Sequence, residues 1–246
     1  MAYSLIGKDF IPPDVHGKVT GKAKYAEDFK VDGMLHARLL TSPVPHARIV
    51  RLDVSKALQM EGVVAVLTAD DFPSIPNLGN PILTNEPAYV GDPILAIAAT
   101  NEGVAEDALQ AINFDFEPLP FVVDPLTSLR PGGPHARTQG NVGNATMQDD
   151  FRSIHWSNDE MASLINGDLP QGESAREWIV GDLGAGFAAA PYTIDESFVT
   201  ASYSHNSMEP RSALAYWENG KCFLYGSSQS QSFPFPRARW IYRNRA

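Results

Sequence analysis

The sequence predicts an α+β fold made of short strands and short helices. Apolar runs of strand length occur at Val63–Leu67 and at residues 94–100. Apolar residues recur at helical spacing through residues 102–112, and an Asn-Gly pair separates two aromatic-rich runs within residues 215–225. With 246 residues, 43% of them hydrophobic, the chain is long enough for one large domain or two ordinary ones with a packed core.

Composition excludes several classes of function. A formal net charge of -10 argues against nucleic-acid binding, which requires clustered Lys and Arg. The single cysteine, Cys222, excludes an internal disulfide and cannot supply the four thiolates that an iron–sulfur cluster usually needs. The N-terminus has neither an apolar signal region nor a twin-arginine pair, and no stretch approaches a membrane span. We therefore expect no nucleic-acid partner, no membrane span and a cytoplasmic location.

The first half of the chain predicts strand, helix, strand. Val63–Leu67 follows Gly62, and residues 94–100 form a second, nearly all-apolar run; both suit buried strands. Residues 102–112 predict an amphipathic helix. Apolar and polar residues then alternate at positions 112–117, which indicates a half-buried strand.

Residues 131–176 change character and predict an interdomain connection. The stretch opens with Pro-Gly-Gly-Pro and is rich in Gly, Asn, Asp and Ser. A purely disordered linker is the alternative. Scattered apolar side chains indicate that parts of the connection pack against something: Phe151, Ile154, Trp156 and Ile165.

The last third of the chain predicts a short helix, a strand and a hairpin. Residues 181–190 suit the helix, and a strand is expected to include Tyr192, Ile194, Phe198 and Val199. In the hairpin, Asn219 and Gly220 form the turn, because both turn positions need positive φ.

Residues 18–28 (Lys-Val-Thr-Gly-Lys-Ala-Lys-Tyr-Ala-Glu-Asp) carry no catalytic chemistry of their own. By residue type they predict a surface strand followed by a turn. Five further segments follow in order: residues 33–38 (Gly-Met-Leu-His-Ala-Arg), 42–49 (Ser-Pro-Val-Pro-His-Ala-Arg-Ile), 62–68, 89–96 and 116–120. The set resembles the a/b hammerhead domain of the xanthine dehydrogenase and aldehyde oxidase family over roughly residues 14–130.

Residues 204–215 look like the opening of this family's first molybdenum-cofactor domain. The resemblance implies a hammerhead domain at residues 14–130, a connection at 131–176 and the start of an incomplete α+β molybdopterin-binding domain at 177–233. Residues 234–246 are an atypical tail.

Gln229 is the candidate cofactor-binding residue. It lies in Gly-Ser-Ser-Gln-Ser-Gln, residues 226–231, after the second hairpin strand. By residue type alone it belongs to a polar loop. In the family that the chain resembles, a glutamine at this position donates a hydrogen bond to an oxygen ligand of the molybdenum, and a neutral amide can do so without adding charge. For Gln231, an orienting role and a structural role remain equally open.

Other patterns favour structural interpretations. Glu209 precedes a proline and lies beside Arg211, so a paired carboxylate that fixes a turn is favoured over a general base. Residues 184–189 formally match a dinucleotide-binding pattern but lack its context, so we expect a Gly/Ala-rich helix packed closely on a sheet. The histidines are scattered, which argues against a protein-ligated metal, and His46 and His205 are predicted to be hydrogen-bonded structural residues.

The resemblance implies a molybdenum-dependent hydroxylase or dehydrogenase subunit. Such enzymes oxidise an aldehyde, an N-heterocycle or a similar small substrate with oxygen derived from water. The implied cofactor is molybdenum–molybdopterin in its cytosine dinucleotide form, with 2Fe-2S clusters and FAD on a separate iron–sulfur subunit and FAD subunit. Which substrate is oxidised is not predicted, because the pocket residues should follow Gln231.

Residues 232–246 do not continue the family pattern. Four arginines occur within the nine residues 237–245 of an otherwise acidic chain. We therefore expect an N-terminal part of such a subunit, truncated or frameshifted and inactive in isolation. The alternative is a non-catalytic hammerhead module that docks with partner subunits.

Overall fold

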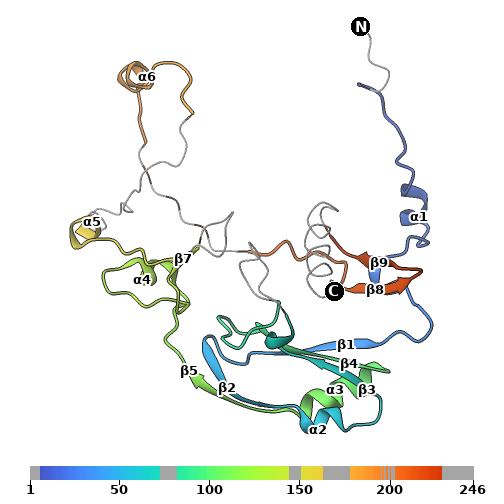
Figure 1. Cartoon of the computed structure of the whole chain (residues 1–246). Helices are drawn as coiled ribbons and strands as arrows, with labels where there is room; N and C mark the ends of the chain where they lie inside the picture. The colour runs from blue at the N-terminus through green and yellow to red at the C-terminus, as the bar shows by residue number, and fades with distance from the viewer. Residues whose placement is uncertain are drawn as a thin grey trace. The chain divides into compact units, whose positions relative to one another are not determined.

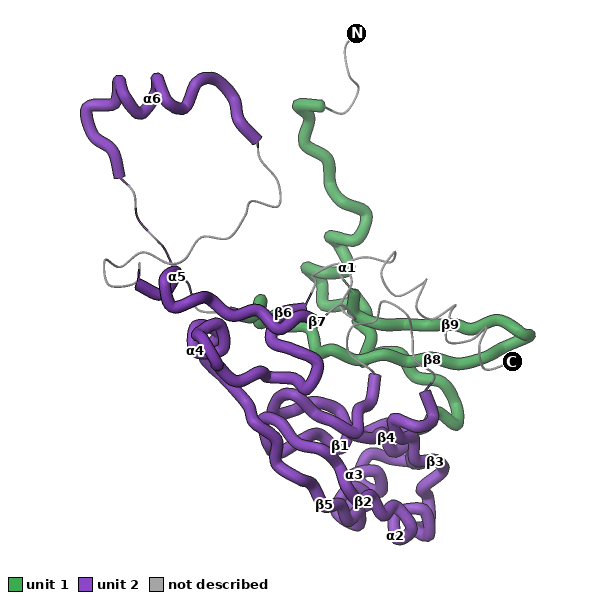
Figure 2. The backbone as a smooth tube through the Cα atoms, turned by 60° about the vertical axis from the view of Figure 1, so that its left-hand side comes forward, with its two compact units in different colours: residues 1–34, 204–246 green, residues 35–203 purple. Residues whose placement is uncertain are grey.

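The computed structural model describes residues 6–72, 82–143, 151–162, 178–194, 196, 198, 200 and 203–228. The chain divides into two compact units (Figure 2), whose helices and strands are labelled in Figure 1. Unit 1 comprises Met1–Met34 and Ser204–Ala246, and unit 2 comprises Leu35–Tyr203. None of the described helices has the length and apolarity of a membrane span.

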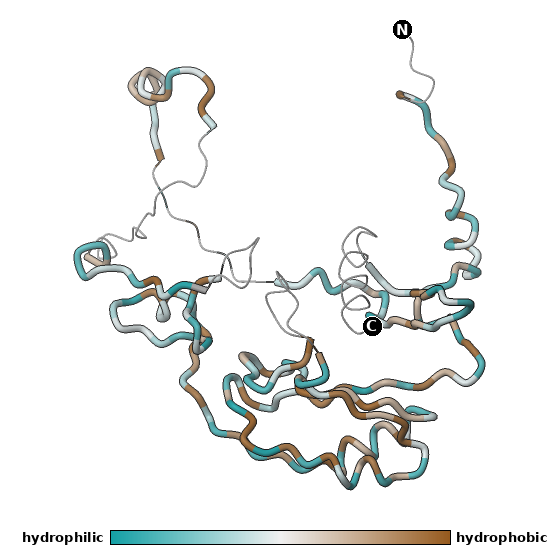
Figure 3. The backbone as a smooth tube through the Cα atoms, viewed as in Figure 1, coloured by the Kyte–Doolittle hydropathy of each residue, from teal (hydrophilic) through white to brown (hydrophobic). Residues whose placement is uncertain are grey.

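Unit 2 is built around a three-stranded antiparallel sheet. Strand β4 (Pro93–Ala99) lies between β1 (His36–Thr41) and β3 (Val63–Leu67). Hydrophobic residues recur along these strands (Figure 3). Because β4 is hydrogen-bonded along both edges, its side chains can be buried on both faces without leaving backbone groups unpaired.

The core of unit 2 lies between this sheet and two helices, α2 (Ser55–Leu58) and α3 (Glu102–Gln110). Asn101 caps α3 by accepting a hydrogen bond from the Val104 amide at 2.9 Å. The buried cluster consists of Ala57, Leu95, Ile97, Ala108 and Ile112.

A second antiparallel pair, β2 (Ala47–Asp53) and β5 (Asn113–Pro118), continues the same unit. Its register shifts between Ile49 and Arg51, and Arg51 Nε donates to Asp115 Oδ2 at 2.6 Å. Short elements complete the unit: η2 (Ala69–Asp71), α4 (Pro125–Leu129), β6 (Val142–Gly143), β7 (Phe151–Arg152), α5 (Asn158–Ala162) and α6 (Leu183–Ala189).

The described parts of the predicted connection pack back onto α4. The Asn141 side chain exchanges two hydrogen bonds with the backbone of Ile154, at 2.7 and 2.8 Å. The Trp156 amide donates to the Leu129 carbonyl at 2.7 Å. These parts are therefore ordered by hydrogen bonds, as their scattered apolar residues suggest. The domain boundaries at 130, 176 and 233 stay predictions.

Unit 1 combines the N-terminal segment with the predicted hairpin. It contains α1 (Val15–Val19), the 3-10 turn η1 (Ala26–Asp28), β8 (Ala213–Glu218) and β9 (Lys221–Gly226). The surface strand expected within residues 18–28 is wrong. An Asp14–Lys18 ion pair at 2.6 Å accompanies a helical turn there instead, and Gly21 ends it with a φ of 69°.

The predicted strands at 63–67, 94–100 and 112–117 are confirmed as β3, β4 and β5, and the helix at 102–112 is confirmed as α3. The strand expected near residues 192–199 is not formed by its described residues; residues 195, 197 and 199 lie outside them. Helix α6 is present, but among the described residues it does not pack closely on a sheet. Phe187 is 63% exposed and a Cβ added at Gly186 would meet no atom within 4 Å.

We expect Ile97→Ala to lower the free energy of unfolding by about 3 kcal/mol, because it leaves a cavity between β4 and the helices. Val64→Ala is the matched control on the same sheet. Its side chain is 55% exposed, so the change should stay within about 0.5 kcal/mol. Urea unfolding of the 246-residue chain measures both, and equal losses would contradict the core placement of Ile97.

Candidate functional site

The β8–β9 hairpin leads directly into the segment that contains Gln229. Its register runs from Glu218↔Lys221 beside the turn to Ala213↔Gly226 at the open end. Asn219 and Gly220 have φ values of 51° and 74°, which confirms the predicted Asn-Gly turn. The open end is therefore where the chain leaves β9.

An aromatic stack supports one face of the hairpin. Tyr216 stacks on Phe223 with ring centroids 5.0 Å apart, and Tyr225 stacks on Phe29 from the N-terminal segment at 4.5 Å. A side-chain hydrogen bond with Tyr225 raises the pKa of Tyr216. The stack links residues almost 200 positions apart in sequence and anchors the end of β9.

Ser227 is held immediately after β9. Its single hydroxyl hydrogen is shared between two acceptors, Glu209 Oε1 at 3.2 Å and the Pro210 carbonyl at 3.1 Å. Its amide donates to the Ser212 carbonyl at 3.4 Å, which extends the ladder by one step. The segments on either side of the open end are therefore joined through both donors of Ser227, its hydroxyl and its amide.

The structure corrects the interpretation of Glu209. The expected pair with Arg211 is absent from the ion pairs of the described residues, and the half-buried Glu209 carboxylate accepts from Ser227 instead. The Arg211 side chain is exposed. Adjacency in the sequence did not produce a pair, because the hairpin brings a hydroxyl from 18 residues away to the carboxylate.

Gln229 and Gln231 lie outside the described residues, so the cofactor contact of Gln229 stays a prediction. Ser227, which donates to Glu209, Pro210 and Ser212, lies two residues before Gln229 in the sequence.

The residues at the open end fit a group bound by hydrogen bonds. Ser212 Oγ is buried and has no hydrogen-bond partner among the described residues. Leaving such a hydroxyl unpaired costs about 1–3 kcal/mol, which favours a polar group beside it. Within the described part of the chain, no group of three or more His, Cys, Asp or Glu side chains could hold a metal ion.

A second polar cluster, in unit 2, surrounds Glu86. Its carboxylate accepts a hydrogen bond from Thr138 Oγ1 and one from Arg48 at 3.2 Å. His46 is 4% exposed and its Nε2 lies 3.5 Å from Glu86 Oε1. Nδ1 of His46 lies 2.5 Å from the Pro120 carbonyl, which can only accept, so Nδ1 carries the proton. His46 is thus the structural histidine that the sequence predicted.

At Glu86, burial raises the pKa of the carboxyl group, whereas the neighbouring hydrogen bonds and charge lower it. Burial favours the neutral acid, but hydrogen bonds from Thr138 and Arg48 outweigh it and hold the pKa of Glu86 below its ordinary value. Glu86 was not identified from the sequence, because nothing in its local pattern distinguishes it from a surface carboxylate.

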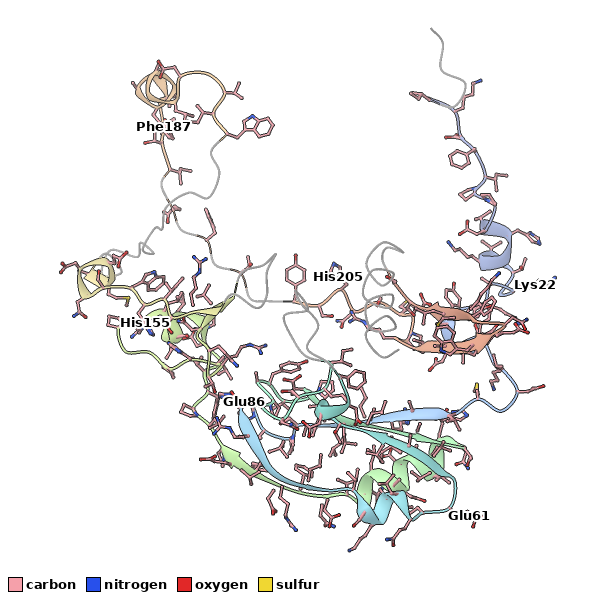
Figure 4. The ribbon with its side chains drawn as sticks, in the orientation of Figure 1. Lys22, Glu61, Glu86, His155, Phe187 and His205 are labelled. Atoms are coloured by element: carbon pink, nitrogen blue, oxygen red, sulfur yellow. The ribbon has the colours of Figure 1, made fainter. Side chains whose placement is uncertain are left out.

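A cavity of about 310 Å³ lies beside this cluster, with His46, Pro120, His135 and Arg137 in its lining. His135 Nε2 and His155 Nε2 are 3.0 Å apart, and His155 Nδ1 lies 3.0 Å from the Arg130 carbonyl. Figure 4 labels Glu86 and His155. The two histidine contacts join residues 130–135 to residue 155, and the Thr138–Glu86 hydrogen bond joins the same stretch to the loop before β4, so these contacts have a structural role.

His205 does not follow the prediction made for it. It is exposed and makes no hydrogen bond to another described residue (Figure 4). The structural role expected for His205 is therefore not supported by its contacts in the described residues.

Comparison with known proteins identifies the family. The model of the aldehyde oxidase and xanthine dehydrogenase a/b hammerhead domain matches residues 20–120, and that of the molybdopterin cofactor-binding domain matches residues 166–234. The chain belongs to the xanthine dehydrogenase and aldehyde oxidase family. The predicted fold class, an α+β hammerhead domain followed by molybdopterin-binding sequence, is confirmed.

Curated relatives in this family are longer than the chain. A probable xanthine dehydrogenase subunit from Bacillus subtilis (strain 168) is 32% identical over 89% of this chain and 26% of that protein. The nicotinate dehydrogenase large molybdopterin subunit of Eubacterium barkeri is 30% identical over 88% of this chain and 45% of that protein. The chain thus spans less than half of the length of these two relatives.

Solved structures of the family share the fold. Quinoline 2-oxidoreductase from Pseudomonas putida 86 matches 96% of this chain and 28% of its own, with a TM-score of 0.68 and 24% identity. Aldehyde oxidoreductase from Desulfovibrio gigas matches 88% of this chain and 23% of its own, with a TM-score of 0.56 and 26% identity.

Glu86→Gln should remove an acid-sensitive part of the stability of unit 2. Because the pKa of Glu86 is depressed on folding, its contribution is present above the unfolded value of about 4.3 and is lost as the pH falls through the lower folded value. The wild type should therefore exceed the variant in free energy of unfolding most clearly above about pH 5, and this difference should shrink below about pH 4.

Urea unfolding between about pH 3 and 7 measures this difference. Glu61→Gln is the matched control, because Glu61 is exposed. A difference between wild type and Glu86→Gln that does not change with pH would contradict the assignment.

Proposed function

We propose that this chain supplies the hammerhead domain and the opening of the cofactor domain of a molybdenum-dependent hydroxylase or dehydrogenase subunit. The observation that carries the proposal is the order of the two family matches, residues 20–120 and then 166–234, with the β8–β9 hairpin inside the second. The substrate class is an aldehyde, an N-heterocycle or a similar small molecule.

Gln229 binds the cofactor in this proposal. Its side-chain amide donates a hydrogen bond to an oxygen of the molybdenum–molybdopterin group, and its neutrality avoids competition with the group's own ligands. When bound, that group supplies two-electron oxidation of the substrate carbon. The cytosine dinucleotide form of the cofactor is part of the same proposal.

We propose that electrons leave the molybdenum centre through iron–sulfur clusters and FAD held outside these 246 residues. This chain has one cysteine, too few for a 2Fe-2S cluster. We therefore propose an iron–sulfur subunit and an FAD subunit as partners. The name of the Eubacterium barkeri relative, a large molybdopterin subunit, is compatible with such a division of cofactors.

The 246-residue chain is not sufficient for turnover in this proposal. It spans 26% of the Bacillus subtilis relative and 45% of the Eubacterium barkeri relative. More than half of the length of each relative therefore has no counterpart in these 246 residues. In this proposal, the substrate pocket is formed by residues outside them.

The test is to tag this chain in its native host and purify what assembles with it. We expect molybdenum, cytosine nucleotide, iron and FAD to copurify, and the complex to reduce a dye with an aldehyde or N-heterocycle. The isolated chain should reduce no dye. Turnover by the isolated chain would contradict the proposal that it is not sufficient for activity. A complex that lacks molybdenum would favour the docking-module alternative.

Gln229→Ala should lower dye reduction per molybdenum about ten- to a hundredfold, the usual cost of losing a hydrogen bond to a metal centre's ligand. Gln59→Ala is the control, because Gln59 is an exposed glutamine at the end of α2, and it should stay within about twofold. Molybdenum content by mass spectrometry and initial rates on the purified complex measure both. Equal effects of the two changes on the rate per molybdenum would contradict the proposed cofactor contact of Gln229.

A further inference from the structure

The two ring nitrogens of His46 both face groups that can only accept a hydrogen bond. Nδ1 lies 2.5 Å from the Pro120 carbonyl oxygen, and Nε2 lies 3.5 Å from Glu86 Oε1. Neither a carbonyl oxygen nor an ionised carboxylate has a proton to donate. A proton on Nδ1 therefore satisfies the Pro120 carbonyl, but a ring with this proton alone presents a lone pair to the Glu86 carboxylate.

Burial makes such a neutral ring unfavourable. Nε2 of His46 is buried and has no hydrogen-bond partner among the described residues. A neutral ring would leave this buried acceptor unpaired, and beside a negative charge. A second proton, on Nε2, turns the same contact into an attraction between opposite charges. The placement of the ring therefore favours its doubly protonated, positively charged form.

The surrounding charges balance when His46 is charged. Arg48 of β2 donates to Glu86 Oε2 at 3.2 Å and also lies 3.7 Å from Glu117 Oε2 of β5, so one guanidinium serves two carboxylates. A charged His46 supplies the second positive charge. Burial and the positive charge of Arg48 oppose protonation of the ring, but the charge of Arg48 is already divided between two carboxylates. The other titratable or charged side chains that line the adjacent cavity are His135 and Arg137.

We propose that His46 is an imidazolium ion in the folded chain and that its contact with Glu86 is a proton-dependent link within unit 2. The charged ring joins the loop before β4, through Glu86, to Pro120 after β5. Thr138 joins the same carboxylate from the connection after α4. Loss of the Nε2 proton as the pH rises leaves two acceptors facing each other, so these segments separate more readily. The inference does not rest on the proposed cofactor contact.

The first experiment determines the protonation of His46 directly. Nuclear magnetic resonance of the 246-residue chain, with 15N-labelled histidine, shows which ring nitrogens carry a proton, and the signal missing from His46→Gln assigns the residue. At about pH 7, both nitrogens of His46 should be protonated in the wild type. In Glu86→Gln, Nδ1 alone should carry a proton, because the uncharged amide does not stabilise the imidazolium and can itself donate to Nε2.

Either of two results would overturn the proposal. One is a wild-type His46 ring with a single proton at about pH 7. The other is a ring that is doubly protonated in both the wild type and Glu86→Gln, because the carboxylate would then not be what holds the second proton. The wild-type spectrum decides the protonation state without any variant, so this test stands even where a substitution prevents folding.

The second experiment measures hydrogen exchange of the same chain between about pH 6 and 9, as protection factors that correct for the faster intrinsic exchange at high pH. Two amides report on the linked segments: Leu119 donates to the His46 carbonyl at 3.0 Å, and Ile49 donates to the Asn85 carbonyl at 2.8 Å. Their protection factors should fall about tenfold over the pH range in which His46 loses its Nε2 proton. Amides within β4 should keep theirs, which shows that the fold is intact.

Matched variants assign this pH response. Glu86 and Glu117 both contact Arg48, but only Glu86 is paired with His46. Glu86→Gln should therefore have low protection at Leu119 and Ile49 without a pH-dependent fall, whereas Glu117→Gln should keep the fall. His135→Gln should keep it as well, because His135 is not part of the link. A fall of equal size in Glu86→Gln, or its loss in His135→Gln, would overturn the proposal.

Discussion

Burial of strand β4 is the constraint on which unit 2 depends. The side chains of Ile94, Leu95 and Ile97 are fully buried, and β4 is paired on both edges. A strand in this position has no tolerance for a register slip, because a one-residue shift would turn every side chain to the opposite face. The positions of β1, β3 and α3 follow from it, and so does the loop that enters β4. In that loop the Thr84 amide donates to the Pro93 carbonyl.

The loop before β4 contains Glu86, and the Glu86 carboxylate contacts residues from distant segments of the chain. Arg48 comes from β2, His46 precedes β2, and Thr138 comes from the connection after α4. A single ionised carboxylate can accept from both Arg48 and Thr138, because it has several lone-pair directions, while His46 lies beside it. The result is a cross-link between the hammerhead strands and the described part of residues 131–143, and it explains why this stretch is ordered despite its loop-like composition.

The hairpin of unit 1 also depends on a contact with a distant segment of the chain. A two-stranded hairpin is only marginally stable alone, and here Phe29 of the N-terminal segment stacks on Tyr225. The same unit places Glu209 against Ser227. Residues 15–28, which carry the first of the family motifs, thus belong spatially with the hairpin that precedes Gln229.

The sequence alone determined the family, from motif order, and the elements whose pattern is local. Strands β3, β4 and β5, helix α3 and the hairpin turn follow from hydrophobic periodicity and turn chemistry within a few residues. Residues 18–28 failed as a predicted strand, because an ion pair one helical turn apart and a glycine stop suit a short helix equally well. Only the tertiary structure decided which polar side chains meet: Glu209 pairs with Ser227 rather than with Arg211, and Glu86 gathers partners from three segments. Such contacts join residues from 18 to 52 positions apart. No local pattern encodes them, because they depend on strand register and on which face of each strand is buried.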